Sequence, residues 1–173
     1  IGVTGVQTCA LPILILVSVG TPTHPASGQT DMSALDTVAK QIALSLKSSG
    51  SKKNIAICST VPPGTTENRF RPLLNEFGLH DNRFVLAFMP EFLREGSAIQ
   101  DFRKPSRLII GTRLSDHAKP FLALRPDCIK IAFLVKTEEA EMAKLVENSW
   151  HALKVVFANE ISGICQSLLI DAN

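Results

Sequence analysis

The sequence predicts an α/β protein with a doubly wound sheet followed by one long helix. Short apolar segments bounded by turn residues alternate with segments of helical periodicity as far as residue 135. Such alternation is typical of strands joined by right-handed helical crossovers. From residue 137 the helical pattern meets no proline or glycine until Gly163. We therefore expect a sheet domain over residues 14–135 and a helical region over residues 136–173.

Each expected strand is a short apolar run that ends at a polar, glycine or proline residue. Runs that are apolar at every position are expected for strands buried on both faces, which favours a parallel sheet. The expected strands cover residues 14–19, 55–58, 84–88, 108–110 and 129–133.

Helical segments separate most of these strands. The first should begin with a capping box, in which Ser33 is followed three residues later by Asp36, and should end near Gly50. A second helix is expected over residues 70–77, where four apolar residues share one face, and a third, poorly marked, around residues 117–124.

The composition excludes several classes of partner and site. A net charge of +2, few aromatic residues and no run of basic residues argue against a nucleic-acid surface. The apolar stretch 11–19 is shorter than the roughly 20 residues of a membrane span and has no basic leader, so we expect no membrane segment. Cys9, Cys58, Cys128 and Cys165 lack the spacing of a metal site or a disulfide framework. We interpret them as small buried residues of a cytoplasmic protein.

Both ends of the sequence look like cuts. The segment from Val3 to Ile13 resembles the conceptual translation of a common sequencing-adapter oligonucleotide. We therefore treat residues 1–13 as an artefactual leader and expect native sequence to begin near Leu14. The last residues, 169–173, follow a helix without a closing element, so the chain is expected to be an internal fragment.

Three motifs directly follow expected strands: Gly20-Thr21-Pro22, Ser59-Thr60-Val61 and Pro90-Glu91. In open α/β sheets, ligands bind beyond the carboxyl ends of the strands, where backbone groups and helix N-termini converge. Each motif alone would be an ordinary turn. Together they predict one crevice that collects all three.

Two carboxylates after the third strand, Glu91 and Glu95, would share a face if this turn enters a helix. One of them would then act as a base or bind a hydroxyl group. The alternative is a solvated acidic pair beside Arg94.

A polar stripe marks the long helix, for which Thr137 is the expected N-cap. Lys144, Asn148, His151 and Asn159 fall within an arc of roughly 80° at about 100° per residue. Most of the other circumference is apolar, so we expect a helix that is buried nearly all round, with a ligand as partner of the stripe. Lys144 and Asn148 would stabilise an oxyanion, and His151 would bind a phosphate or hydroxyl group. The alternative is a solvated stripe in which a glutamate pairs with Lys144.

Over residues 14–173 the chain resembles the UDP-glucose/GDP-mannose dehydrogenase family. The matching motifs are Val19 to Pro22, Ser59 to Thr65, Pro90 to Ile99 and the helix from Ala140 onward. Within the family, Asn148 to Ala152 and Phe157 to Glu160 most resemble the GDP-mannose 6-dehydrogenase branch.

The resemblance implies an NAD-dependent oxidoreductase that converts the C6 alcohol of a nucleotide sugar to a carboxylate in two steps through a cysteine thioester. The first candidate for the nucleotide sugar is GDP-mannose. It implies the C-terminal part of a Rossmann-like NAD-binding domain, followed by the start of a central domain that forms a homodimer. The catalytic residues would be Glu91 as base, Lys144 and Asn148 at the reacting oxygen, and Thr60 beside the catalytic water. NAD would contact Val19, Gly20, Thr21, Pro22, Thr23, Ser59, Thr60, Val61 and Glu95. The substrate would contact Glu91, Phe92, Leu93, Arg94, Glu95, Lys144, Asn148, His151 and Asn159.

The chain departs from the family's pattern in three places. It has neither the glycine-rich dinucleotide motif with its acidic ribose-binding residue nor the Gly-Gly-Ser-Cys-Phe-Pro motif of the nucleophilic cysteine. Met89 stands where the family usually has a small polar residue or asparagine. We therefore expect the 173 residues alone to be inactive.

Three other functions remain open from the sequence. The chain could belong to a UDP-sugar 6-dehydrogenase acting on UDP-glucose or a UDP-N-acetyl-hexosamine. It could also belong to a β-hydroxyacid dehydrogenase, which is similar in sheet topology and in a helix with Lys and Asn four residues apart. The third possibility is a noncatalytic interaction module whose long helix only dimerises.

Overall fold

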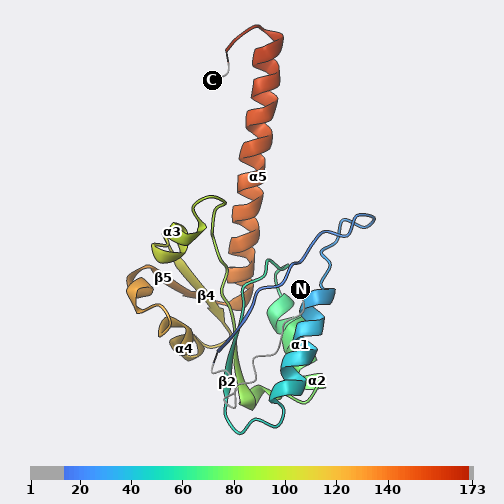
Figure 1. The fold of residues 1–173 in the computed structure, drawn as a ribbon, viewed down its shortest axis with the longest axis vertical. Helices are drawn as coiled ribbons and strands as arrows, with labels where there is room; N and C mark the ends of the chain where they lie inside the picture. The colour runs from blue at the N-terminus through green and yellow to red at the C-terminus, as the bar shows by residue number, and fades with distance from the viewer. Residues whose placement is uncertain (1–13, 172–173) are drawn as a thin grey trace.

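A computed structural model describes residues 14–171, so the predicted leader, residues 1–13, lies outside the described residues. The described part is a five-stranded sheet with helices on both faces and a long helix that leaves the body of the domain (Figure 1). The strands, which lie in sequence order across the sheet, are β1 (Leu14–Val17), β2 (Lys53–Ile57), β3 (Phe84–Phe88), β4 (Leu108–Thr112) and β5 (Ala132–Val135). The α-helices are α1 (Ser33–Leu46), α2 (Arg71–Glu76), α3 (Ala98–Arg103), α4 (Lys119–Leu122) and α5 (Thr137–Ser167). Shorter helical turns are η1 (Thr66–Phe70), η2 (Asp81–Arg83), η3 (Ser115–Ala118) and η4 (Pro126–Ile131). The predicted α/β class with a long final helix is confirmed.

The sheet is mixed, and the expectation of a parallel sheet is wrong at one step. β1, β2 and β3 are parallel, β4 is antiparallel to β3, and β5 is parallel to β4. β4 pairs with only the last two residues of β3, so its first residues extend beyond the carboxyl end of β3. β4 therefore runs back beside the segment that follows β3.

The first three strands end level with one another, which positions the loops that follow them. Val17, Ile57 and Phe88 are neighbours across the sheet. The backbone pairing continues by one residue, since the N–H of Cys58 donates to Val17 and the N–H of Met89 donates to Ile57, both at 2.8 Å. The three predicted motifs therefore leave the same edge of the sheet side by side.

Alternate strand residues fill two apolar layers, one on each face of the sheet. One layer joins β2 and β3 to α1 and α2, and its fully buried members include Ile55, Ile57, Leu86, Phe88, Leu35, Phe70 and Leu74. The other joins the same strands to β4 and α4 through Ala56, Val85, Ala87, Ile110 and Phe121. Helices on both faces explain why the strands are apolar at successive positions.

Several boundaries differ from the sequence prediction by up to about three residues, and for two of them the structure shows the reason. The capping box at α1 is wrong, because Asp36 instead binds Arg69 of the neighbouring segment at 2.7 Å, and Met32 is the N-cap residue. The fifth strand begins at Ala132 and not at residue 129, because residues 126–131 form a 3₁₀ turn.

The long helix packs on the sheet only through its first turns. Its buried residues are Thr137, Ala140, Glu141 and Lys144, and every residue from Asn148 to Glu160 is exposed. The expectation of a helix buried nearly all round is therefore wrong within the described residues. At 31 residues α5 is about 46 Å long at 1.5 Å per residue, far longer than the sheet it crosses (Figure 1). Its predicted N-cap, Thr137, is the first helical residue, and Glu139 accepts a hydrogen bond from the N–H of the true N-cap, Lys136, at 2.8 Å.

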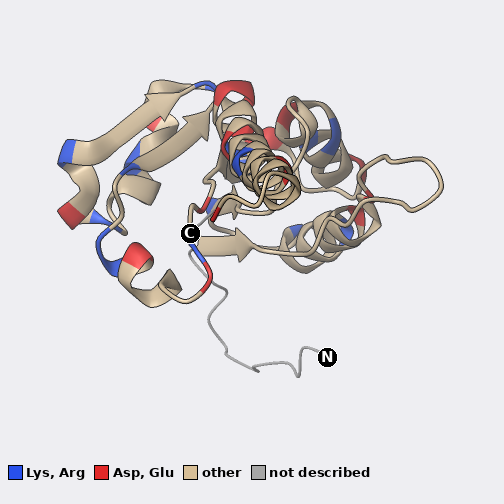
Figure 2. Ribbon diagram, turned by 90° about the horizontal axis from the view of Figure 1, so that it is seen from above, with Lys and Arg blue, Asp and Glu red and all other residues tan. Residues whose placement is uncertain are grey.

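Seen from above, α5 stands between the side of the sheet formed by β4 and β5 and the side covered by α1 and α2 (Figure 2). This placement requires a glycine in β4. A Cβ atom on Gly111 would lie 2.6 Å from the Cβ of Ala140 and 3.0 Å from the Cα of Thr137. Both positions belong to α5, so Gly111 allows the helix to reach the sheet.

Gly111→Ala should lower the free energy of unfolding by about 1–3 kcal/mol, because the added methyl group forces β4 and α5 apart. Urea unfolding followed by circular dichroism measures the change. Gly163→Ala is the matched control, since a Cβ at this helical position meets nothing within 4 Å. It should leave stability unchanged or raise it by up to about 1 kcal/mol. Equal effects of the two substitutions would contradict the close approach.

Candidate active site

A lysine from the long helix binds the segment that follows β3. The Nζ atom of Lys144 donates to the backbone carbonyl of Glu91 at 2.5 Å and to its carboxylate Oε1 at 2.9 Å. The lysine side chain is 7% exposed and that of Glu91 is 44% exposed. Lys144 thus presents a nearly buried ammonium group at the edge where β1, β2 and β3 end.

The Glu91 carboxylate is held in its charged form. Burial opposes ionisation, but the hydrogen bond from Lys144, the N–H of Leu93 and the lysine charge outweigh it, so the pKa of Glu91 lies below its ordinary value. The Leu93 bond, at 2.8 Å, uses the second carboxylate oxygen. Glu91 is therefore an ionised group able to accept a proton at neutral pH.

Beside this ion pair lies an open pocket of ≈ 540 Å³ between β4, β5 and α5. Phe92 forms part of its wall, with the guanidinium of Arg107 4.4 Å from the ring centroid and the ammonium of Lys144 5.5 Å from it. Arg107 is also paired with Glu147 of α5. The rest of the lining is aromatic (Phe133, Trp150), basic (His151, Lys154) and aliphatic (Ile109, Ala143, Val146). Aromatic faces next to cations suit an anionic ligand that carries a ring.

The loops after β1 and β2 are joined by two hydrogen bonds. The N–H of Val19 donates to Ser59 Oγ at 2.8 Å, and the hydroxyl of Thr21 donates to the carbonyl of Thr60 at 2.6 Å. Nothing lies within 4 Å of a Cβ built on Gly20, so a ligand can approach the backbone here. The loops after β1 and β2 thus form one open surface, which fits the edge of a dinucleotide site.

Three predicted residues after Glu91 are arranged differently from the expectation. Residues 91–94 are not helical, and α3 begins only at Ala98, so Glu91 and Glu95 do not share a helical face. The carboxylate of Glu91 instead holds the N–H of Leu93 two residues on, which keeps this segment extended. Arg94 pairs with Asp101 of α3 at 2.7 Å, and this guanidinium holds the pKa of Asp101 well below its usual range. Leu93, Arg94 and Glu95 are exposed.

The polar stripe of α5 is only partly brought to this site. Asn148 is exposed one helical turn beyond Lys144, and His151 lines the pocket beside Phe92. Asn159 is also exposed, and it lies about 22 Å further along the helix than Lys144 at 1.5 Å per residue. Within the described residues, Asn159 is thus separate from the lysine site.

One cysteine lies near the site but is not poised as a nucleophile. Cys58 directly follows β2, and burial together with the charge of Glu91 raises the pKa of its thiol to about 11. A thiolate is the reactive form, so at pH 7 only about one molecule in 10⁴ would carry it.

The chain matches two family models. The NAD-binding domain of the UDP-glucose/GDP-mannose dehydrogenase family matches residues 6–124, and the central domain of the same family matches residues 138–173. The chain belongs to the UDP-glucose/GDP-mannose dehydrogenase family. The predicted resemblance is thereby confirmed, and the predicted cofactor, NAD, is the one that this family's first domain binds.

Individual relatives support the same assignment. GDP-mannose 6-dehydrogenase of Pseudomonas putida is 34% identical over 158 residues, which are 90% of this chain and 36% of that protein. The crystal structure of a ternary complex of GDP-mannose dehydrogenase from Pseudomonas aeruginosa superposes with a TM-score of 0.83 at 31% identity, over 92% of this chain and 37% of that one. A UDP-glucose dehydrogenase from Pyrobaculum islandicum gives a TM-score of 0.85 at 34% identity, over 92% and 36%. The chain therefore spans little more than a third of the relatives that it matches.

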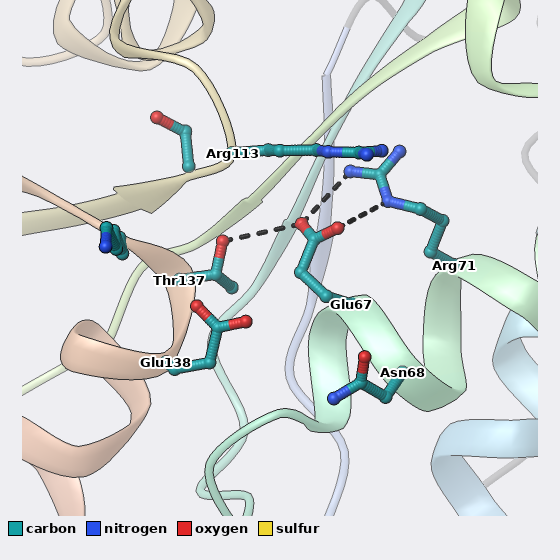
Figure 3. Close-up of a pocket in the computed structure, with 8 residues that line it drawn as sticks. Glu67, Asn68, Arg71, Arg113, Thr137 and Glu138 are labelled. Atoms are coloured by element: carbon teal, nitrogen blue, oxygen red, sulfur yellow. Dashed lines mark hydrogen bonds and ion pairs between the residues drawn. The ribbon is translucent and has the colours of Figure 1, made fainter.

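A second pocket, of ≈ 350 Å³, lies at the start of α5 and contains none of the predicted site residues (Figure 3). At its centre Glu67 pairs with Arg71 at 2.7 Å and accepts a hydrogen bond from Thr137 at 3.4 Å. These contacts join η1 and α2 to the beginning of α5.

None of the helices between residues 14 and 171 combines the length and the apolar character that a membrane span requires.

Several residues of the site were not foreseen. Arg107, Glu147 and Trp150 line the pocket beside Lys144, and Glu141 joins α5 to the loop after β2. Trp150 and Glu147 lie on α5 within one to two turns of Lys144, which is a signal that helical spacing could have supplied. Arg107 comes from a loop before β4, and only the antiparallel return of that strand brings it here.

Lys144→Met should raise the pKa of Glu91, since burial, the largest influence on it, remains while the hydrogen bond and the charge of the lysine are lost. Because the folded-state pKa is lowered in the wild type, ionised Glu91 stabilises the fold above about pH 4.5, and this contribution is lost as the pH falls through the folded pKa. The loss on the acid side should shrink in the variant. A carboxyl ¹³C NMR titration measures the pKa directly.

The control for this titration is Lys154→Met. Lys154 is on the same helix, and its ammonium lies 5.7 Å from the Trp150 ring centroid. It should leave the pKa of Glu91 unchanged. A Glu91 pKa that does not move in Lys144→Met would show that the ion pair is absent in solution.

Proposed function

We propose that this chain carries part of the NAD site and the oxygen-polarising residues of a cytoplasmic nucleotide-sugar 6-dehydrogenase, with GDP-mannose as its substrate. The proposal rests on the position of Lys144. Its ammonium group is nearly buried, is bonded to Glu91 and lies beside the loops after β1 and β2. A buried ammonium next to an open pocket is a group suited to stabilise negative charge on a bound substrate.

The domain division follows from the same proposal. Residues 14–135 would form the C-terminal part of the NAD-binding domain, and residues 136–173 the start of the central domain. The loops 19–23 and 59–61 would hold NAD. When bound, NAD supplies an acceptor for the hydride that leaves C6 of the sugar.

Lys144 would donate to the C6 oxygen of the sugar, with Asn148 one turn further as a second donor. Negative charge develops on this oxygen as its proton is lost, and a positive group in a partly dry site stabilises that charge more than water would. The contacts of Lys144 with Glu91 hold the ammonium in place before the substrate arrives, so little reorganisation is needed.

Glu91 would act in the second half of the reaction, where a thioester is hydrolysed to the carboxylate. As an ionised carboxylate it can accept the proton of the attacking water, with Thr60 beside that water. The thioester requires a reactive cysteine. We propose that it belongs to the two thirds of the relatives' length that this chain does not span, because the Cys58 thiol is protonated at neutral pH.

The substrate would lie in the pocket lined by Phe92, His151 and Arg107, with His151 near its phosphate or hydroxyl groups. Leu93, Arg94 and Glu95 would border the sugar from their exposed turn. UDP-glucose is the second candidate for the substrate, since some similar relatives are UDP-glucose dehydrogenases.

Two chimaeras test this proposal. Residues 14–171 would replace the matching segment in the GDP-mannose 6-dehydrogenase of Pseudomonas putida and in the UDP-glucose 6-dehydrogenase of Rhizobium meliloti. Both should form NADH with the substrate of their host, and the first should retain the larger fraction of its parent's kcat/KM. Lys144→Met should lower kcat by about 10²–10³-fold, since the lysine acts on the transition state.

The exposed Lys130→Met serves as the control and should leave kcat unchanged. The isolated chain should form no NADH. A chimaera that unfolds like its parent but gives no turnover would refute the enzymatic role, and a larger retained fraction in the UDP-glucose host would reassign the substrate.

We also propose that the projecting part of α5 forms a dimer with a second copy. Between Asn148 and Ser167 only Lys154 and Glu160 are charged, while Trp150, Leu153 and Phe157 are each more than half exposed. An apolar face of this size on an isolated helix favours association.

Sedimentation velocity of the chain should therefore show a concentration-dependent dimer. Phe157→Gln should weaken dimerisation by about 10-fold or more, since a buried aromatic side chain contributes more than 1.4 kcal/mol. The neighbouring change Glu160→Gln should not. A monomer at all concentrations would rule the dimer out.

A further inference from the structure

A buried carboxylate on α5 has no part in the chemistry described above. Glu141 is fully buried and lies three residues before Lys144 on the same helix. Its Oε2 accepts a hydrogen bond from the N–H of Gly64 at 2.5 Å, and its Oε1 accepts from the N–H and the hydroxyl of Thr66 at 2.8 and 2.6 Å. Three donors on one carboxylate make this the most heavily bonded contact between α5 and the rest of the domain among the described residues.

The partners of Glu141 belong to the segment that follows the loop after β2. Gly64 has φ +88°, a conformation that favours glycine, and this turn directs its N–H towards α5. Thr66 is the first residue of η1, so the carboxylate receives free N–H groups at the start of that turn. Residues 59–61, assigned above to the cofactor, lie immediately before this turn. Glu141 thus links the cofactor loop to the helix that carries the lysine.

Packing a helix through a buried carboxylate costs desolvation free energy. Burial raises the pKa of Glu141 even though the Thr66 and Gly64 bonds favour its charged form. An apolar residue of similar size would often give an equally stable fold. What the carboxylate adds is direction, because three short hydrogen bonds define both the rotation and the axial position of α5, whereas apolar contacts such as that of Ala140 allow sliding.

We propose that Glu141 is a positioning residue, which sets α5 so that Lys144 meets Glu91 at a fixed distance from the loop 59–61. The proposal rests on the function proposed above only in that Lys144 is the group that polarises the reacting oxygen. α5 has only four buried residues, all between positions 137 and 144, and its later pair of Glu147 with Arg107 is partly exposed, so few other contacts hold the helix if this link is lost.

Glu141→Gln tests the proposal in the 173-residue chain. The amide has one acceptor oxygen, so its NH₂ group would oppose the N–H of either Gly64 or Thr66. The expected result is that the Glu91 carboxyl pKa, read by ¹³C NMR, rises towards the value found in Lys144→Met. The double variant should show no further rise, because both changes remove the same contact. Thr66→Val, which removes only the hydroxyl donor, should give an intermediate shift and provides a milder test if Glu141→Gln does not fold.

Leu74→Ala is the matched control for a purely structural effect. Leu74 is a fully buried residue of α2, and its truncation should lower the melting temperature without moving the Glu91 pKa. A Glu91 pKa that stays at the wild-type value in both Glu141→Gln and Thr66→Val would overturn the positioning role. None of these measurements uses NAD or a sugar, so inactive chimaeras would refute the proposed function and leave this result standing.

Discussion

The contact between Lys144 and Glu91 depends on the direction in which the chain crosses the sheet. Because β4 runs antiparallel to β3, and β5 follows it in parallel, β5 runs away from the loops after β1 to β3 and ends at Val135, level with Gly111 and Phe88. α5 reverses this direction, and after two turns its lysine arrives at the segment that follows β3.

The same geometry places charged groups where they are partly dry. Lys144 and Glu141 are both buried on the face of α5 that meets the sheet, yet each has partners that match its charge. Lys144 meets a carboxylate and a carbonyl oxygen, and Glu141 meets only donors. A buried charge is tolerated when it is paired and hydrogen-bonded, so the position of α5 has to bring both groups to their partners.

The sequence predicted the local elements well where a single period determined them. The strands at residues 53–57 and 84–88 and the start of α5 lie within two residues of their predicted positions, since apolar runs and helical spacing are local signals. The predicted capping box at Ser33 and Asp36 is not formed, because the Asp36 carboxylate binds Arg69, which is 33 residues away in the sequence. The prediction that Glu91 and Glu95 share a helical face was wrong, because the Glu91 carboxylate accepts a hydrogen bond from the N–H of Leu93 and keeps this segment extended.

What the sequence determined by itself is therefore the family, the α/β class and the identity of the groups that follow each strand. The tertiary structure alone decided which of those groups meet. It joined Lys144 to Glu91, brought Arg107 to Phe92 and attached Glu141 to Gly64 and Thr66, while it left Asn159 on a projecting helix. The physical reason is that residue types and spacing carry local periodicity, whereas the direction of β4 depends on pairing between strands that are distant in the sequence.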